Sequence, residues 1–144
     1  RDHVVRLKQK IKKKEKNIIP VRNIEITVDE KTGVITMLNN GNGVDVAKHP
    51  ENKLWIPEMI FGHLRTSTNY KKDEKKIVGG KNGFGFKLVL IYTKWGEIET
   101  VDHIRKKKYF QRFEDNLNII KAPKITKSTS LKTTGILSLK ESLI

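Results

Sequence analysis

A glycine-rich stretch at residues 78–87, Val-Gly-Gly-Lys-Asn-Gly-Phe-Gly-Phe-Lys, carries the residue types best suited to chemistry in this 144-residue chain. The apolar run from Leu88 to Tyr92 follows it and predicts a buried helix. Glycines let the backbone approach a ligand closely, and the free N–H groups of a helix N-terminus attract anions. The stretch therefore predicts an anion site, although many glycine-rich segments are only turns.

A second polar group lies at the end of a predicted hairpin. Residues 24–28 alternate apolar and polar side chains, residues 29–33 have turn chemistry, and residues 34–38 read as a more buried strand. The second strand ends at Asn39, in the sequence Asn-Asn-Gly-Asn-Gly. A carboxamide both donates and accepts hydrogen bonds, so Asn39 could read an adenine. Asn-Gly pairs are also ordinary turn formers, and this alternative stays open.

The remaining pattern predicts a single domain built from short strands and helices. Val4, Leu7 and Ile11 indicate the tail of an amphipathic helix. Pro57 is placed to begin a second helix, whose Ile56, Ile60 and Leu64 should face the core. Residues 65–76 are polar and favour a lid over the glycine stretch. Three further segments read as strands: 95–101, 109–113 and 134–139. Residues 116–130 read as irregular.

The charge is strongly positive, with 30 Lys and Arg against 16 Asp and Glu and a formal net charge of +14. Such a field attracts nucleic acid or nucleotide phosphates. The basic clusters at 12–16 and 105–108 nevertheless read most simply as solvated surface. His49 and His63 read as structural or surface residues, not as metal ligands or bases. The absence of cysteine excludes disulfides and favours an intracellular protein. No apolar run approaches the roughly 18 residues of a membrane helix.

In combination, these motifs resemble the ATP-binding domain of type IIA DNA topoisomerases of the eukaryotic and large-DNA-virus kind, members of the GHKL superfamily. The resemblance runs from Asp2 to about Leu139, and it rests on N-N-G-x-G, W-I-P-E-M-I-F-G, T-S-T-N-Y and G-G-K-N-G-F-G-F-K. It implies an α/β (α+β) fold: a two-layer sandwich with a mixed, mostly antiparallel sheet and helices on one face. Residues 1–144 are expected to form one ATP-binding domain, incomplete at both ends.

The resemblance also implies a role for each candidate residue. Asn39 would contact the adenine region, while Ser67, Thr68 and Asn69 would bind ribose and phosphate from the lid. Lys87 would be a charge partner of the phosphates. The residues expected to wrap the triphosphate are Gly80, Lys81, Asn82, Gly83, Phe84, Gly85, Phe86 and Lys87.

The chain departs from the family pattern in several places. Val44-Asp45 stands where the family usually has Ile-Pro, and Phe84 and Phe86 stand where it usually has Tyr and a small residue.

The family motif Glu-x-x-x-Asn-x-x-Asp is represented only by Asp2. The resemblance therefore implies that the general-base Glu and the Mg²⁺-binding Asn lie upstream of Arg1, and that no catalytic or metal-binding residue lies within the chain. A lysine of the following transducer domain would lie after Ile144.

The activity implied by the resemblance is ATP hydrolysis with Mg²⁺. Nucleotide binding would draw the two N-terminal domains of a homodimer together and close a gate on double-stranded DNA. The parent protein would then be nuclear if cellular, or in the host cytoplasm or virion if viral, with no membrane partner. Two alternatives remain. One is another GHKL ATPase, such as a MutL-like repair protein, and the other is a basic nucleic-acid-binding domain without catalysis, which the +14 charge supports.

Overall fold

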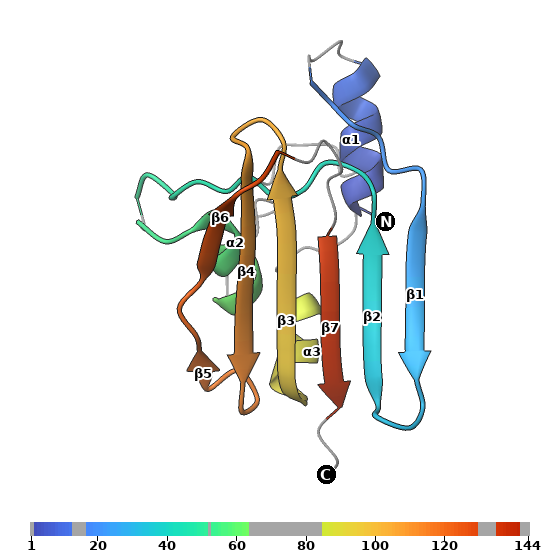
Figure 1. Ribbon diagram of the computed structural model, residues 1–144, viewed down its shortest axis with the longest axis vertical. Coiled ribbons are helices and arrows are strands. Elements are labelled where there is room, and N and C mark those ends of the chain that lie inside the picture. The colour runs from blue at the N-terminus through green and yellow to red at the C-terminus, as the bar shows by residue number, and fades with distance from the viewer. Residues whose placement is uncertain (1, 13–16, 52, 64–84, 130–134, 142–144) are drawn as a thin grey trace, which may run out of the picture.

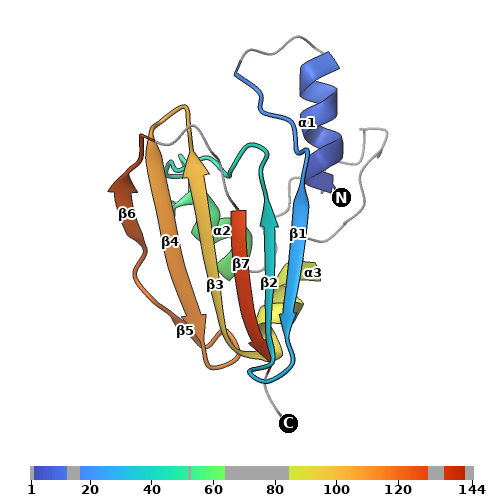
Figure 2. The same cartoon turned by 45° about the vertical axis from the view of Figure 1, so that its right-hand side comes forward.

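One antiparallel sheet organises the molecule in the computed structural model, which describes residues 2–12, 17–51, 53–63, 85–129 and 135–141 (Figure 1). The strand order is β1-β2-β7-β3-β4-β5, and β6 also pairs with β4. Figures 1 and 2 show α2 and α3 on the same side of this sheet, which confirms the predicted two-layer α/β sandwich. The strands are β1 (Ile24–Asp29), β2 (Val34–Asn39), β3 (Thr93–Asp102), β4 (Lys107–Glu114), β5 (Ile119–Ile120), β6 (Lys124–Lys127) and β7 (Gly135–Glu141).

The predicted hairpin between residues 24 and 39 is confirmed. Asp29 closes its turn, because its side chain accepts hydrogen bonds from the backbone N–H groups of Lys31 at 3.0 Å and Thr32 at 3.3 Å. Gly33 has a φ of +68°, a conformation that other residues rarely adopt.

Strand β1 was expected to have one exposed face, and that prediction is wrong because both faces are exposed. Ile24, Ile26 and Val28 are each more than half exposed. The reason is positional: β1 is the end strand of the described sheet, and it pairs only with β2.

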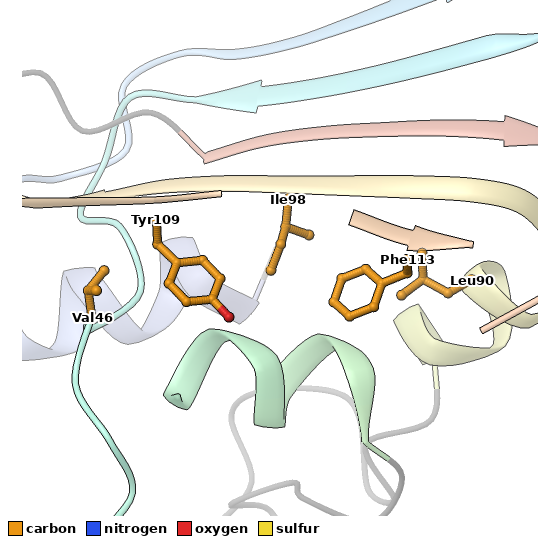
Figure 3. Close-up of a cluster of buried hydrophobic side chains, with 5 residues drawn as sticks. All are labelled: Val46, Leu90, Ile98, Tyr109 and Phe113. Carbon is orange, nitrogen blue, oxygen red and sulfur yellow. The ribbon is translucent and has the colours of Figure 1, made fainter. Parts of the chain in front are cut away.

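The core lies between the sheet and the helices (Figure 3). The Tyr109 ring is fully buried there, and its hydroxyl donates to the Gln111 side chain at 2.7 Å. Gln111 in turn donates to the backbone carbonyl of Lys121 at 3.0 Å, so the buried polar groups are satisfied. Burial raises the pKa of Tyr109, and the nearby Glu58 carboxylate adds to the effect. The core side chains are Val46, Leu90, Ile98, Tyr109 and Phe113.

Helix α2 (Ile56–Gly62) begins where Pro57 predicted it. Its buried residues are Pro57, Met59 and Gly62. Ile56 is half-buried, but Ile60 is 37% exposed, so the prediction that Ile60 faces the core is wrong. A Cβ on Gly62 would lie 2.8 Å from a ring carbon of Phe113, which shows how closely α2 approaches β4.

Two further helices complete the described chain. Helix α1 (Asp2–Lys12) buries Leu7. The predicted helix at 88–92 is present as α3 (Gly85–Ile91), which begins within the glycine-rich stretch. In α3, Lys87 and Leu90 are buried, whereas Leu88 and Val89 are exposed. The helix is therefore buried on one side only, although its apolar run predicted a fully buried helix. None of the helices in the described ranges has the length and apolar character needed to cross a bilayer.

Residues 116–130 were expected to be irregular, but they contain two strands. β6 pairs antiparallel with β4, with Tyr109 opposite Ile125, and β5 extends the same sheet. The sequence of β6, Lys-Ile-Thr-Lys, is too short and too charged for its alternation to stand out.

Candidate functional site

Asn39 is the last residue of β2, and its backbone is held between Ile24 of β1 and Gly135 of β7. Its side-chain oxygen accepts a hydrogen bond from the N–H of Gly41 at 3.3 Å, which orients the carboxamide. No protein acceptor is assigned to the Asn39 amide nitrogen within the described ranges. This half-buried side chain at the end of a strand therefore presents a donor.

The two other asparagines of this turn hold the incoming chain. The Asn40 side-chain oxygen accepts from the N–H groups of Arg22 and Asn23, each at 2.9 Å. The Asn42 side-chain oxygen accepts from the N–H of Ile19 at 2.7 Å. These two residues therefore have structural roles, which separates them from Asn39.

Two buried polar side chains of β3 fasten the segment that follows the turn. Thr100 accepts a hydrogen bond from the N–H of Val44 at 2.8 Å, and Asp102 accepts one from the N–H of Val46 at 2.9 Å. Asp102 also accepts from the Arg105 guanidinium at 2.8 Å. Burial alone would raise the pKa of Asp102, but these donors and the Arg105 charge outweigh it and hold the pKa below its ordinary value.

Sequence reasoning missed the tether made by Asp102, because its backbone partner Val46 lies 56 residues earlier in the chain. The signal that could have indicated it is a carboxylate at the end of an otherwise buried strand. Arg105 also pairs with Asp45 at 3.3 Å. Asp45, where the family pattern has proline, therefore has a local function as an outer partner of Arg105.

Glycine is required at two positions of the Asn39 turn by close approach. A Cβ on Gly43 would collide with the Val101 carbonyl and the Thr100 hydroxyl. A Cβ on Gly41 would collide with Val21 and would lie 3.1 Å from Leu7 of α1. The turn is thus packed between α1 and β3, and Asn39 is fixed in place.

Lys87 lies in the first turn of α3 and is only 2% exposed. Burial lowers the pKa of its ammonium group, because the charged form loses hydration. A phosphate beside the ammonium would favour the charged form again. Such a lysine is chemically suited to bind an anionic ligand.

The strand register places Asn39 on the face of the sheet that the helices cover. Met37, two residues earlier, is opposite Leu137, which is itself opposite Ile98 of the core. Directly paired residues point to the same face, and residues two apart along a strand share a face. Asn39 therefore belongs to the face on which α3 packs and carries Lys87.

The other predicted site residues are only partly described. Gly85 and Phe86 begin α3. The predicted lid at 65–76 and Leu64 lie outside the described residues. So do eight of the candidate binding residues: Ser67, Thr68, Asn69, Gly80, Lys81, Asn82, Gly83 and Phe84.

The two chain ends, beyond which the missing catalytic residues were expected, also fall outside the described ranges. Arg1, upstream of which the general-base Glu and the Mg²⁺-binding Asn are expected, is not among the described residues, and neither is Ile144. The structure therefore first describes this region at Asp2, which begins α1. The assignment of the general base to a position before Arg1 stays a prediction.

His49 and His63 each make a local contact within the chain. His63 lies 3.2 Å from Glu58, and the His49 ring accepts a hydrogen bond from the N–H of Glu51 at 3.3 Å. Where the structure is described, no group of three or more His, Cys, Asp or Glu side chains is arranged to hold a metal ion.

This arrangement of sheet, helices and strand-end asparagine is the GHKL-type ATP-binding fold. The ATPase domain of Thermus thermophilus gyrase B shares the fold, with a TM-score of 0.64 over 97% of this chain and 33% of that one, at 17% identity. The ATPase region of Saccharomyces cerevisiae topoisomerase II superposes more closely, with a TM-score of 0.81 and 34% identity over 96% of this chain and 35% of that one. No family model matches the sequence.

Sequence comparison carries the assignment further. The DNA topoisomerase 2 of Acanthamoeba polyphaga mimivirus is 53% identical over 116 residues, which is 78% of this chain and 9% of that protein. The DNA topoisomerase 2 of Saccharomyces cerevisiae is 42% identical over 106 residues, 74% of this chain and 7% of that protein. The chain belongs to the DNA topoisomerase 2 family and corresponds to part of its ATPase region. It spans less than a tenth of these relatives and about a third of the solved ATPase region.

Proposed function

We propose that this chain binds an adenine nucleotide, with Asn39 at the base and Lys87 at the phosphates. The observation that carries the proposal is the placement of an oriented amide donor and a buried lysine on one face of the sheet. A carboxamide matches the donor and acceptor pattern of adenine, and a buried ammonium is neutralised by phosphate.

The glycine stretch before α3 supplies the remaining phosphate contacts in this proposal. Backbone N–H groups from Asn82 to Gly85 would donate to the phosphate oxygens, and Ser67, Thr68 and Asn69 would contact ribose and phosphate. Among the described residues, no group of three or more His, Cys, Asp or Glu side chains is arranged to hold Mg²⁺.

In the whole protein, we propose that nucleotide binding draws two ATPase regions together and that ATP hydrolysis drives the passage of double-stranded DNA. The protein would then act as a homodimer inside the cell, in the nucleus or in a virus-infected cytoplasm. Its relatives named DNA topoisomerase 2 come from eukaryotes and from a virus, which supports this reading over a MutL-like protein.

A titration with a fluorescent adenine nucleotide tests the proposal. We expect the chain to bind it weakly and Asn39→Ala to weaken binding about tenfold, the effect of losing a hydrogen bond of about 1.4 kcal/mol. Asn118→Ala, a turn asparagine distant in sequence, is the matched control and should bind normally. Equal affinity for Asn39→Ala and the control would remove Asn39 from the site.

Turnover provides a separate test of the catalytic assignment. Only Asp2 represents the motif that carries the family's general base, which is expected before Arg1, so steady-state hydrolysis by the chain alone should be undetectable. Measurable phosphate release by the purified chain would show that a catalytic residue does lie within it.

A further inference from the structure

The sheet edge formed by β4 and β6 carries lysines that the proposed nucleotide site does not use. Lys107, the first residue of β4, is directly opposite Lys127, the last residue of β6. Directly opposed residues have Cβ atoms roughly 5 Å apart, and like charges there are unfavourable. Figures 1 and 2 show β6 beside β4 at the outer side of the sheet. The fold thus places two cations side by side on an open surface.

A third lysine joins them through Trp55. Lys48 and Trp55 form an isolated antiparallel bridge, and the Lys48 Nζ lies 5.5 Å from the centre of the Trp55 ring. The Lys107 Nζ lies 5.8 Å from the same ring. The face of an aromatic ring attracts ammonium groups. We call Lys48, Lys107 and Lys127 the lysine cluster.

The carboxylate directly opposite Lys107 in the sheet is already paired with another cation. Asp102 is in register with Lys107, and both Asp102 and Asp45 pair with Arg105. In the described part of the chain, the lysine cluster forms no ion pair with a carboxylate. Its positive charge is therefore available to a partner. The three lysines come from three separate segments of the chain, which the fold brings together.

We propose that the lysine cluster is a docking surface for the phosphate backbone of double-stranded DNA. Cations on an open sheet edge fit a long polyanion, whose duplex carries one negative charge per roughly 1.7 Å of its axis. Contacts of this type give affinity without base specificity. The choice of DNA as the polyanion rests on the proposed function, and the surface is separate from the nucleotide site at Asn39 and Lys87.

Binding of the 144-residue chain to a labelled DNA duplex over a range of salt concentrations tests the proposal. The double variant Lys107→Gln/Lys127→Gln should bind more weakly. Its slope of log affinity against log salt should be shallower by about 2, because each lost phosphate contact removes about 0.9. Lys127→Gln should melt at the same or a slightly higher temperature than the original chain, because a like-charge pair is removed.

Lys31→Gln/Lys94→Gln is the matched control, with the same change in charge on exposed lysines of the β1–β2 turn and the start of β3. It should keep the original salt slope. The proposal is overturned if the chain binds no DNA at low salt, or if both double variants lose the same slope.

Nucleotide titration of the same proteins separates the two proposals. The lysine-cluster variant should bind the fluorescent nucleotide normally. A chain that binds no nucleotide but loses DNA affinity with Lys107→Gln/Lys127→Gln would overturn the nucleotide site and support the docking surface.

Discussion

Asp102 at the end of β3 accepts a hydrogen bond of 2.9 Å from the backbone of Val46, which precedes it by 56 residues. This contact ties the segment after the Asn39 turn to the middle of the sheet. The carboxylate is 4% exposed and is also bound by Arg105. Removing its charge should therefore affect both stability and the shape of the candidate site.

We expect Asp102→Asn to lower the free energy of unfolding by about 2 kcal/mol, because Asn keeps only one acceptor oxygen and loses the charge that pairs with Arg105. Urea denaturation followed by circular dichroism measures the change. Asp45→Asn is the matched control, since Asp45 contacts the same Arg105 but its side chain is 59% exposed. Its cost should stay below about 1 kcal/mol.

Asp102 should also contribute to the pH dependence of the free energy of unfolding. Because folding lowers the pKa of Asp102, its contribution is present above the ordinary carboxyl pKa and is lost as the pH falls through the lowered value. The original chain should therefore lose more stability than Asp102→Asn when the pH is reduced below about 4. Parallel stability curves for the two proteins would contradict this assignment.

Lys87→Ala should weaken nucleotide binding by about tenfold or more, because a charged hydrogen bond to phosphate contributes about 1.5–3 kcal/mol. The far-UV spectrum should remain that of a folded chain. In the parent enzyme the same substitution should also reduce strand passage. Lys94→Ala is the control, being an exposed lysine three residues after α3. Unchanged nucleotide affinity in Lys87→Ala would place this residue outside the site.

The lowered pKa of Lys87 should also make stability depend on pH, but on the alkaline side. At a pH below the pKa of Lys87 in the folded chain, burying the charged ammonium lowers the free energy of unfolding. This destabilisation is lost as the pH rises through that pKa toward 10.5, the ordinary lysine value. Stability should therefore gain a component that rises with pH on the alkaline side in the original chain and is absent from Lys87→Met. Identical alkaline profiles would contradict it.

Gly43→Ala should lower the free energy of unfolding by about 1–3 kcal/mol, because its methyl group would push the Asn39 turn away from β3. Nucleotide affinity should fall with it. Gly33→Ala provides the comparison, since its cost of about 1–2 kcal/mol comes from a positive φ with open space around it. Calorimetry should detect a loss in both variants, while only Gly43→Ala should alter nucleotide binding.

Local patterns predicted the first hairpin and the start of α2. These elements are encoded by residues close together in the sequence: the alternation in 24–38, the turn at Gly33 and the proline at 57. The structure confirms all three. β6 was missed because its four residues carry two lysines, and their pairing with β4 is decided by residues far away in the sequence.

The candidate site was less accessible to sequence reasoning. Asn39 and Lys87 could be named because each lies beside a recognisable turn or helix start, and their roles remain predictions. The tethers made by Asp102, Asn40 and Asn42 join segments 17 to 56 residues apart, and no local pattern encodes such distances. The contribution of Ile60 was also misjudged, because α2 turns Pro57, Met59 and Gly62 inward instead.

The outermost strand has a consequence for handling the chain alone. In the described sheet, β1 has a neighbour on one side only, and Ile24, Ile26 and Val28 project from it. Unprotected strands with β-branched side chains invite association between molecules at high concentration. Ile26→Lys should consequently suppress light scattering in concentrated preparations, and it gives a practical variant for spectroscopy.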